Sequence, residues 1–374
     1  MKNLDQYIGC MIGGAVGDTL GYAVEFKNIE EIQKKYGETG ITEQQLINGK
    51  AQISDETQLT LFTAVGLLVG KTRGRFNQTV DMYSSYLATC YSDWLYTQQE
   101  EKLQPKKTYY TWLCNIPDMY SRRAPENTNI SSIYSGEIGS IEEPINNSNS
   151  CGAVIRVAPI GLCFDTEEFT LDEIDTIGIN SALITHGHPL GYIPCVALVH
   201  MIHVISHNND IKLLDAIVDM KAKIYDKYEF VECIDNRNLN YFITLIDRAI
   251  DLVDKEVEDV EAIQMLGRGR AAEETLAIAI YCSLKYEYDF EKGIIAAANH
   301  TGASDSTASI VGNILGTYLG YNSIPSKFID NLEFKDIIME IAEDLYNSNK
   351  INYMDKNWED KYIYATYMPE NTKE

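Results

Sequence analysis

The chain has 374 residues, of which 45% are apolar and 23% are charged, so it is long enough to bury a sizeable core. Its 55 acidic residues outnumber its 31 Lys and Arg residues, which gives a net charge of −24. Such an acidic surface repels phosphate backbones, which disfavours nucleic acid as a partner and favours a cation or a basic protein.

Helical periodicity dominates the chain, and strict alternation over six or more residues is hard to find. Apolar residues recur at spacings of three and four in residues 55–70, 180–205, 273–286 and 306–320. The expected fold class is therefore all-α, with many helices in one compact domain. Residues 98–150 are polar and rich in turn residues, and we expect there a long ordered excursion with one short helix.

Two predicted helices carry a stripe of very small residues, spaced four apart. The first stripe is Gly9, Gly13, Gly17 and Gly21, and the second is Ala308, Gly312, Gly316 and Gly320. A glycine in a helix interior costs roughly 1 kcal/mol, so chance is a weak explanation. A stripe without side chains lets another helix approach closely. We expect the two helices to pack together, or each to meet another neighbour tightly.

Acids and hydroxyls gather at two predicted helix starts. In ISDETQLTLF (53–62), Ser54 suits the N-cap, and Asp55 and Glu56 fall in the first turn. Capping and favourable interaction with the helix dipole explain this segment when it is taken alone. The segment GASDSTAS (302–309) has the same construction, with Asp305 and Ser306. Two such oxygen clusters, if they face each other, could hold one or two hard divalent cations.

Three further segments carry candidate residues. Asp18 follows a stripe glycine, so a buried, hydrogen-bonded structural role is expected, whereas Glu25 closes the first helix, where an acid is unfavourable. NSCGAVIRVAP (149–159) contains a small-residue turn that could cradle a phosphate. THGHP (185–189) is expected to place two histidines on a helix, either as core residues or as part of a zinc site whose third ligand is not apparent.

Cysteine usage and the N-terminus bear on the compartment. The eight cysteines form no C-x-x-C pair and lie mostly in apolar runs, which favours a reducing compartment and small buried thiols. The N-terminal segment makes a poor signal peptide, and no window approaches 20 uninterrupted apolar residues. We therefore expect a cytoplasmic protein with no membrane contact.

Taken together, these segments resemble the ADP-ribosylglycohydrolase family. The resemblance is carried in order by GDTLG (17–21) with Glu25, by SDETQ (54–58), by CG (151–152) with RVAP (156–159), by THGHP (185–189) and by GASDST (302–307). RRAP with NT (122–128) and AEETLAIAIYCSL (272–284) add to it. It covers about residues 1–345, as one domain, and leaves residues 346–374 as a C-terminal extension.

The resemblance implies an all-α domain with a metal-binding cleft, which cleaves the glycosidic bond that joins ADP-ribose to an arginine or serine side chain or a related adduct. The cofactor it implies is Mg²⁺ or Mn²⁺, and the substrate is ADP-ribose on a protein. The catalytic residues it implies are Glu25, Asp55 and Asp305. The implied metal ligands are Ser54, Asp55, Glu56, Asp305 and Ser306. The implied substrate-binding residues are Cys151, Gly152, Ala153 and Arg156, which hold the diphosphate, and His186.

The sequence departs from the family pattern at four positions. The second aspartate of the first acidic motif is Glu56, and the first aspartate of the last motif is Ala303, which has no ligand atom. One metal should therefore bind, and a second should be weak or absent. The family glycine after R-A-P is Glu126, and Arg270 stands where relatives often have an aromatic residue; both are expected at the rim of the cleft.

These departures leave two functions open. The first is an ADP-ribosyl hydrolase with activity impaired by Ala303 and Glu56. The second is a binding or immunity protein on the same fold, which neutralises an ADP-ribosyltransferase toxin by covering its active site. The charge of −24 would suit a basic toxin surface. Intact Glu25, Asp55 and Asp305 favour the enzyme.

Overall fold

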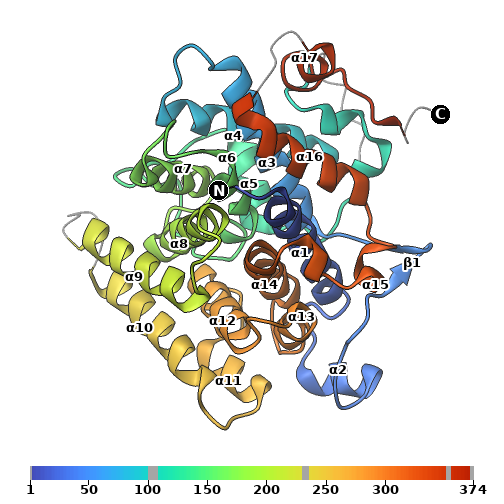
Figure 1. The fold of residues 1–374 in the computed structure, drawn as a ribbon, viewed down its shortest axis with the longest axis vertical. Helices are drawn as coiled ribbons and strands as arrows, with labels where there is room; N and C mark the ends of the chain where they lie inside the picture. Colours follow the sequence, from blue (N-terminus) through green and yellow to red (C-terminus); the bar gives the residue numbers. More distant parts are fainter. Residues whose placement is uncertain (1, 100–107, 230–235, 351–354, 371–374) are drawn as a thin grey trace.

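The computed structural model describes residues 2–99, 108–229, 236–350 and 355–370, and these fold almost entirely into helices (Figure 1). The N-terminal half contains the helices α1 (Leu4–Tyr22), α2 (Ile29–Tyr36), α3 (Asp55–Arg73), α4 (Val80–Thr97), α5 (Asn127–Ser135), α6 (Ala158–Cys163) and α7 (Leu171–Leu183). The C-terminal half contains α8 (Pro189–His207), α9 (Leu213–Tyr228), α10 (Asn236–Val253), α11 (Asp259–Leu266), α12 (Ala272–Lys285), α13 (Phe290–Ala298), α14 (Ser304–Leu319), α15 (Ser326–Ile329), α16 (Lys335–Asn347) and α17 (Lys356–Tyr362). The expected all-α class is confirmed.

Short 3₁₀ helices and one hairpin complete the fold. The 3₁₀ helices are η1 (Trp112–Asn115), η2 (Pro117–Met119), η3 (Val154–Arg156), η4 (Tyr321–Ser323) and η5 (Ser348–Lys350). The strands β1 (Leu46–Ile47) and β2 (Lys50–Ala51) pair antiparallel. In the described part of the predicted excursion, α5 is the one α-helix and the rest is turns and 3₁₀ helix.

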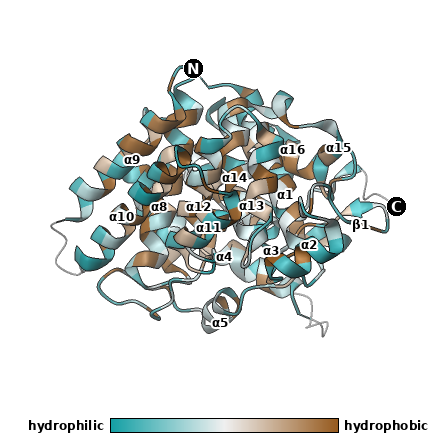
Figure 2. Cartoon of the chain, turned by 90° about the horizontal axis from the view of Figure 1, so that it is seen from below, coloured by the Kyte–Doolittle hydropathy of each residue, from teal (hydrophilic) through white to brown (hydrophobic). Residues whose placement is uncertain are grey.

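The helices α1 and α14 form the centre of the molecule and pack antiparallel along their glycine stripes (Figure 1 and Figure 2). A Cβ atom built on Gly9 would lie 2.1 Å from the Gly316 carbonyl oxygen, and one built on Gly21 would lie 2.2 Å from that of Ser304. The pairing predicted from the stripes is confirmed. Gly320 differs from the prediction, because it closes α14 with φ of 82° and does not continue the helical stripe.

The apolar run of residues 180–205 was predicted as one helical segment, and the structure divides it in two. Helix α7 ends at Leu183 and α8 begins at Pro189, with His188 as its N-cap. Proline supplies no N–H for an internal helical bond but fits the first helical position, which explains the break. The two histidines therefore lie in a turn and at a cap, so their predicted place on a helix is wrong.

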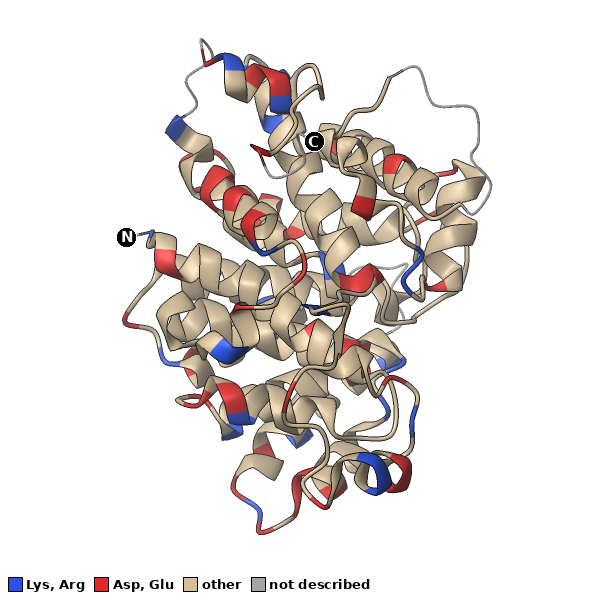
Figure 3. Ribbon diagram, turned by 90° about the vertical axis from the view of Figure 1, so that its right-hand side faces the viewer, with Lys and Arg blue, Asp and Glu red and all other residues tan. Residues whose placement is uncertain are grey.

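Helix α8 is the one helix among the described residues that could cross a membrane by length and composition alone, with a mean hydropathy of 1.5. Within the fold, 89% of its apolar window is buried, as is usual for the central helix of a globular core. Charged residues lie mainly on outer helices and loops, while long stretches of the inner ribbons carry none (Figure 3).

Most of the described cysteines lie in the core, and the last helix packs against it. Of the described cysteines, none is in a disulfide, Cys151 is half-buried and the others are buried; Cys233 lies outside the described residues. Helix α17 packs on the domain, since the Trp358 indole N–H donates to Thr72 Oγ1 at 3.0 Å and the Tyr362 hydroxyl donates to Asp344 at 2.6 Å.

Candidate active site

The two acidic helix starts meet. The Ser306 hydroxyl, in the first turn of α14, donates to Glu56 Oε1, in the first turn of α3, at 2.7 Å. Ser54 caps α3 as predicted, because its Oγ accepts from the Glu56 backbone N–H at 3.1 Å. Residues 250 positions apart in the chain are thus joined by one hydrogen bond, and the oxygen atoms of both clusters share one region.

Asp18 supports this region from α1. It is fully buried, and its Oδ2 accepts from the backbone N–H groups of Ser54 and Thr57, at 3.0 and 3.2 Å, and from the Thr57 hydroxyl at 2.5 Å. Burial raises the pKa of Asp18 to about 6, although these hydrogen bonds oppose the rise. Asp18 therefore fixes the start of α3, as its position beside the glycine stripe suggested.

Four further carboxyl groups lie close enough to repel one another. Glu25 is half-buried in the turn after α1, and its pKa is raised to about 7 by burial and by the charges of Asp55 and Asp18. Burial also raises the pKa values of Asp55, Glu56 and Asp305, and charge repulsion within the group adds to each rise. Ionising all of them together requires a compensating positive charge.

Carboxylate oxygens are suitable ligands for a hard divalent cation, although Asp55 and Asp305 accept hydrogen bonds from nearby backbone N–H groups. No group of three or more His, Cys, Asp or Glu side chains in the described ranges forms a ready metal centre. Asp55 Oδ2 accepts from the Glu126 backbone N–H at 3.1 Å, and Asp305 Oδ1 accepts from the Ser306 N–H at 2.9 Å. Glu56 Oε2 is buried without a hydrogen-bond partner, as expected of an oxygen available to a cation.

Ala303 occupies the N-cap position of α14 and is nearly inaccessible, with 2% of its surface exposed. Its methyl group neither caps the helix nor offers an oxygen to a cation. An aspartate here would have added a carboxylate within two residues of Asp305. Position 303 therefore adds no side-chain oxygen atom beside Asp305.

The turn at residues 151–156 lies beside this cluster. The Cys151 N–H donates to the Arg270 carbonyl oxygen at 3.0 Å, and Cys151 Sγ is 3.4 Å from the Ser306 hydroxyl. The Asn129 side chain donates to the Gly152 carbonyl oxygen at 3.1 Å. Within the described residues, the backbone N–H groups of Gly152 and Ala153 donate no backbone or side-chain hydrogen bond. The turn therefore has free donors of the kind that bind anions.

Arg156 does not face this turn as a free charge. It is fully buried, and its guanidinium donates to Asn129 Oδ1 at 2.9 Å and to Thr185 Oγ1 at 2.7 Å. It also lies over the Tyr91 ring, 4.2 Å from the centroid. Arg156 holds Asn129, and through it the Gly152 carbonyl, so its visible contacts make it a positioning residue of the turn.

His186 lies beside the same turn and is fully buried. Its Nδ1 is 2.8 Å from Thr185 Oγ1, and its Nε2 is 2.9 Å from Ser150 Oγ and 3.4 Å from Glu126 Oε2. Burial lowers the pKa of His186, so the neutral imidazole is favoured. Burial acts to raise the pKa of Glu126, but hydrogen bonds from His186 and Ser150 outweigh it and keep that carboxylate ionised.

Sequence analysis missed Asn129 and Ser150, and it placed Glu126 only at a rim. The signal was present in part, because residues 122–128 were among the familiar segments. The contacts of Asn129, Ser150 and Glu126 depend on the packing of α5 against the turn at residues 151–156. The spacing of residues along the chain does not predict this packing. Arg270 does lie near the expected rim, with its guanidinium 5.0 Å from the centroid of the Phe26 ring, next to Glu25.

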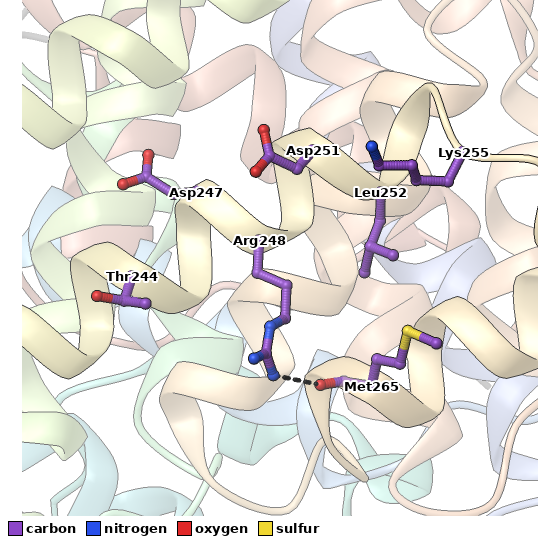
Figure 4. A pocket seen from close by; sticks show the side chains of 7 residues that line it. All are labelled: Thr244, Asp247, Arg248, Asp251, Leu252, Lys255 and Met265. Carbon is purple, nitrogen blue, oxygen red and sulfur yellow. Dashed lines mark hydrogen bonds between the residues drawn. The ribbon is translucent and has the colours of Figure 1, made fainter.

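A surface hollow between α10 and α11 is a separate feature (Figure 4). It measures about 510 Å³ and contains none of the predicted site residues. Its lining consists of Thr244, Asp247, Arg248, Asp251, Leu252, Lys255 and Met265. The convergence of carboxylates, and not this hollow, marks the candidate active site.

Comparison with known proteins bears on the chemistry of the site. The family model for ADP-ribosylglycohydrolase matches residues 1–353. An uncharacterised protein of Archaeoglobus fulgidus is 27% identical over 347 residues, covering 91% of this chain and 96% of its own. ADP-ribosylhydrolase ARH3 of Mus musculus is 20% identical, covering 92% of both chains.

Two further matches agree with these. ADP-ribosyl-[dinitrogen reductase] glycohydrolase of Rhodospirillum rubrum is 23% identical, covering 88% of this chain and 91% of its own. Among solved structures, an ADP-ribosylglycohydrolase-related protein complex superimposes with a TM-score of 0.55 at 16% identity, covering 92% of this chain and 98% of that chain. At 16% identity, this structural match supports the fold and nothing about the function.

Proposed function

Because the chain belongs to the ADP-ribosylglycohydrolase family, we propose that it releases ADP-ribose from a modified arginine or serine side chain, or from a related adduct, with the help of bound Mg²⁺ or Mn²⁺. Family membership supports ADP-ribose hydrolysis in general; the acceptor, the metal and the cytoplasmic location belong to the proposal. The hydrogen bond between Ser306 and Glu56 is its main structural support, because it brings the two acidic helix starts into one site.

In this proposal Ser54, Asp55, Glu56, Asp305 and Ser306 hold the cation. When bound, the cation would supply positive charge for the ribose hydroxyls and the attacking water. Without an oxygen at Ala303, one cation binds firmly and a second weakly or not at all.

Glu25 is the proposed general base. Its carboxyl group is half-buried beside the cluster, and its pKa of about 7 suits proton transfer near neutral pH. The Glu25 carboxylate takes a proton from the water that attacks the anomeric carbon, the glycosidic bond breaks with its electron pair passing to the acceptor nitrogen or oxygen, and the same proton is then passed to that atom. Asp55 and Asp305 favour the positive charge that develops on the ribose ring in an oxocarbenium-like transition state.

The proposal is tested by measuring ADP-ribose release from ADP-ribosylated arginine and serine peptides in Mg²⁺ or Mn²⁺. Asp305→Asn and Glu25→Gln should each lower kcat by about 10²–10⁴-fold, because each removes one charge while keeping the side-chain shape. Glu30→Gln, on the exposed side of α2, removes the same charge elsewhere and should leave the rate unchanged. Equal rates in all four proteins would refute the assignment.

Ala303 and the charge of −24 support the second candidate, an immunity protein that binds an ADP-ribosyltransferase toxin. This function predicts that the wild-type chain releases no ADP-ribose with either metal, and that Asp305→Ala still protects cells from a toxin encoded beside it. Loss of protection in that variant, together with hydrolysis by the wild-type chain, would favour the enzyme.

A further inference from the structure

The diphosphate-binding turn expected at residues 151–156 already has an anion against it. The Glu126 carboxylate lies so close to Gly152 that a Cβ atom built on this glycine would be 1.9 Å from Glu126 Oε2. The other carboxylate oxygen, Oε1, accepts a hydrogen bond from the Ser150 hydroxyl. Glu126 thus covers one side of the turn and engages a hydroxyl group beside it.

The basic side chains nearest the turn, Arg156 and His186, already have partners and do not balance the charge of a phosphate added beside Glu126. Arg156 is fully buried, and its two Nη atoms donate to Asn129, Thr185 and the Ser181 carbonyl oxygen, while its Nε has no hydrogen-bond partner. Both nitrogens of the neighbouring His186 imidazole are hydrogen-bonded, Nδ1 to the Thr185 hydroxyl and Nε2 to the Ser150 hydroxyl. A phosphate that approached Gly152 would therefore meet the Glu126 carboxylate, while the Arg156 guanidinium already donates to Asn129, Thr185 and Ser181.

We propose that Glu126 is a specificity-determining residue whose carboxylate, lying against Gly152 in the turn, disfavours ligands that carry a diphosphate. This inference rests on the proposed function, since it concerns how the same site receives ADP-ribose. A diphosphate reaches the free N–H groups of Gly152 and Ala153 only when the Glu126 side chain turns away. The chain therefore binds ADP-ribose weakly compared with a chain that has glycine at this position.

The local structure allows such a movement. The Glu126 side chain retains 26% of its exposure, so it can turn outward into solvent. The backbone does not need to move, because the Glu126 N–H remains bonded to Asp55 Oδ2. Displacement of the side chain and retention of the acidic cluster are thus compatible.

The test measures binding of ADP-ribose by calorimetry to the full chain and to the Glu126→Gly and Glu126→Gln variants. Glu126→Gly removes both charge and bulk and should tighten binding roughly tenfold or more, whereas Glu126→Gln removes only the charge and should give a smaller gain. Adenosine, which has no phosphate, should bind all three alike. Glu137→Gln, an exposed change just after α5, controls for net charge and should match the wild type.

Each outcome decides the inference separately from the proposed function. Unchanged or weaker ADP-ribose binding in both variants, or no detectable binding in any protein, overturns the role of Glu126. An equal gain for adenosine also overturns it, because the effect would then not concern the diphosphate. Hydrolysis by the wild-type chain is measured in parallel: tighter binding in the variants without hydrolysis supports this inference and refutes the proposed function. A circular dichroism melt confirms that Glu126→Gly is folded.

Discussion

Replacing Gly17 by alanine tests whether the close pairing of α1 and α14 positions the acidic cluster. The added Cβ atom would lie 1.9 Å from the Ala308 carbonyl oxygen, whereas real Cβ atoms keep at least 3.0 Å from such neighbours. The obstacle is backbone, so the helices must separate by about 1 Å or deform. Such overpacking costs about 1–3 kcal/mol, and the higher helix propensity of alanine offsets about 1 kcal/mol of this.

We therefore expect Gly17→Ala to lower the free energy of unfolding by about 1–2 kcal/mol in urea denaturation. Catalysis should suffer more than stability, because Gly17 precedes Asp18 and Ala308 lies one turn after Asp305. A displacement near 1 Å between reacting groups can reduce the rate about 10²-fold. ADP-ribose release measured on the folded variant, well below its melting temperature, separates the two effects.

The matched control is Gly178→Ala in α7, another buried helical glycine. There the nearest atom to the new Cβ would be in the Val199 side chain, at 3.1 Å, and the nearest backbone atom of a neighbouring helix would be at an ordinary contact distance of 3.8 Å. This variant should be as stable as the wild type or slightly more stable. If Gly17→Ala behaved like Gly178→Ala in both assays, the close backbone contact of α1 and α14 would be refuted.

Two further predictions concern charge at the site. Ala303→Asp adds a buried carboxylate beside Asp305, so the melting temperature of this variant in EDTA should fall below that of the wild type. Added Mg²⁺ should raise the melting temperature of the variant more than that of the wild type. An equal effect of Mg²⁺ on both proteins would contradict the assignment of Asp305 as a ligand. Because the pKa values of Asp18 and Glu25 are raised to about 6 and 7, the folded chain binds more protons than the unfolded chain between about pH 4 and pH 7. The contribution of these groups to the free energy of unfolding in EDTA should thus fall as the pH rises through that window, and a Glu25→Gln variant should show a smaller fall; identical pH profiles would refute the raised pKa of Glu25.

The sequence predicted the helix pair and the acidic cluster because both depend on regular spacing. Stripe residues four apart fall on one helix face, and the Ser54 cap fixes where Asp55 and Glu56 begin their turn. The break at His188 was missed because apolar residues keep helical spacing on both sides of the polar residues 185–188, although Pro189 is a signal for a new helix start.

The position of the Glu126 carboxylate could not be predicted in the same way. It depends on α5 packing over the turn at Gly152, and on a hydrogen bond from Ser150, 24 residues away. Likewise, the sequence suggested that Arg156 contacts the substrate, whereas a fully buried guanidinium with three partners is visible only once α7 and the turn are in place. Motif spacing identifies which residues gather, but tertiary packing decides which way each side chain turns.

The acidic cluster and the glycine stripes depend on each other. The carboxylates come from the end of α1 and the starts of α3 and α14, and their mutual repulsion acts to move these segments apart. A hard cation at the proposed site would need its oxygen ligands within about 2.6 Å, so even a small separation of the helices would weaken its binding. Larger residues along the stripes would relieve the repulsion by separating α1 from α14, and would move the acids apart. The absence of side chains at the glycines, despite their lower helix propensity, is therefore a condition for bringing the acids together.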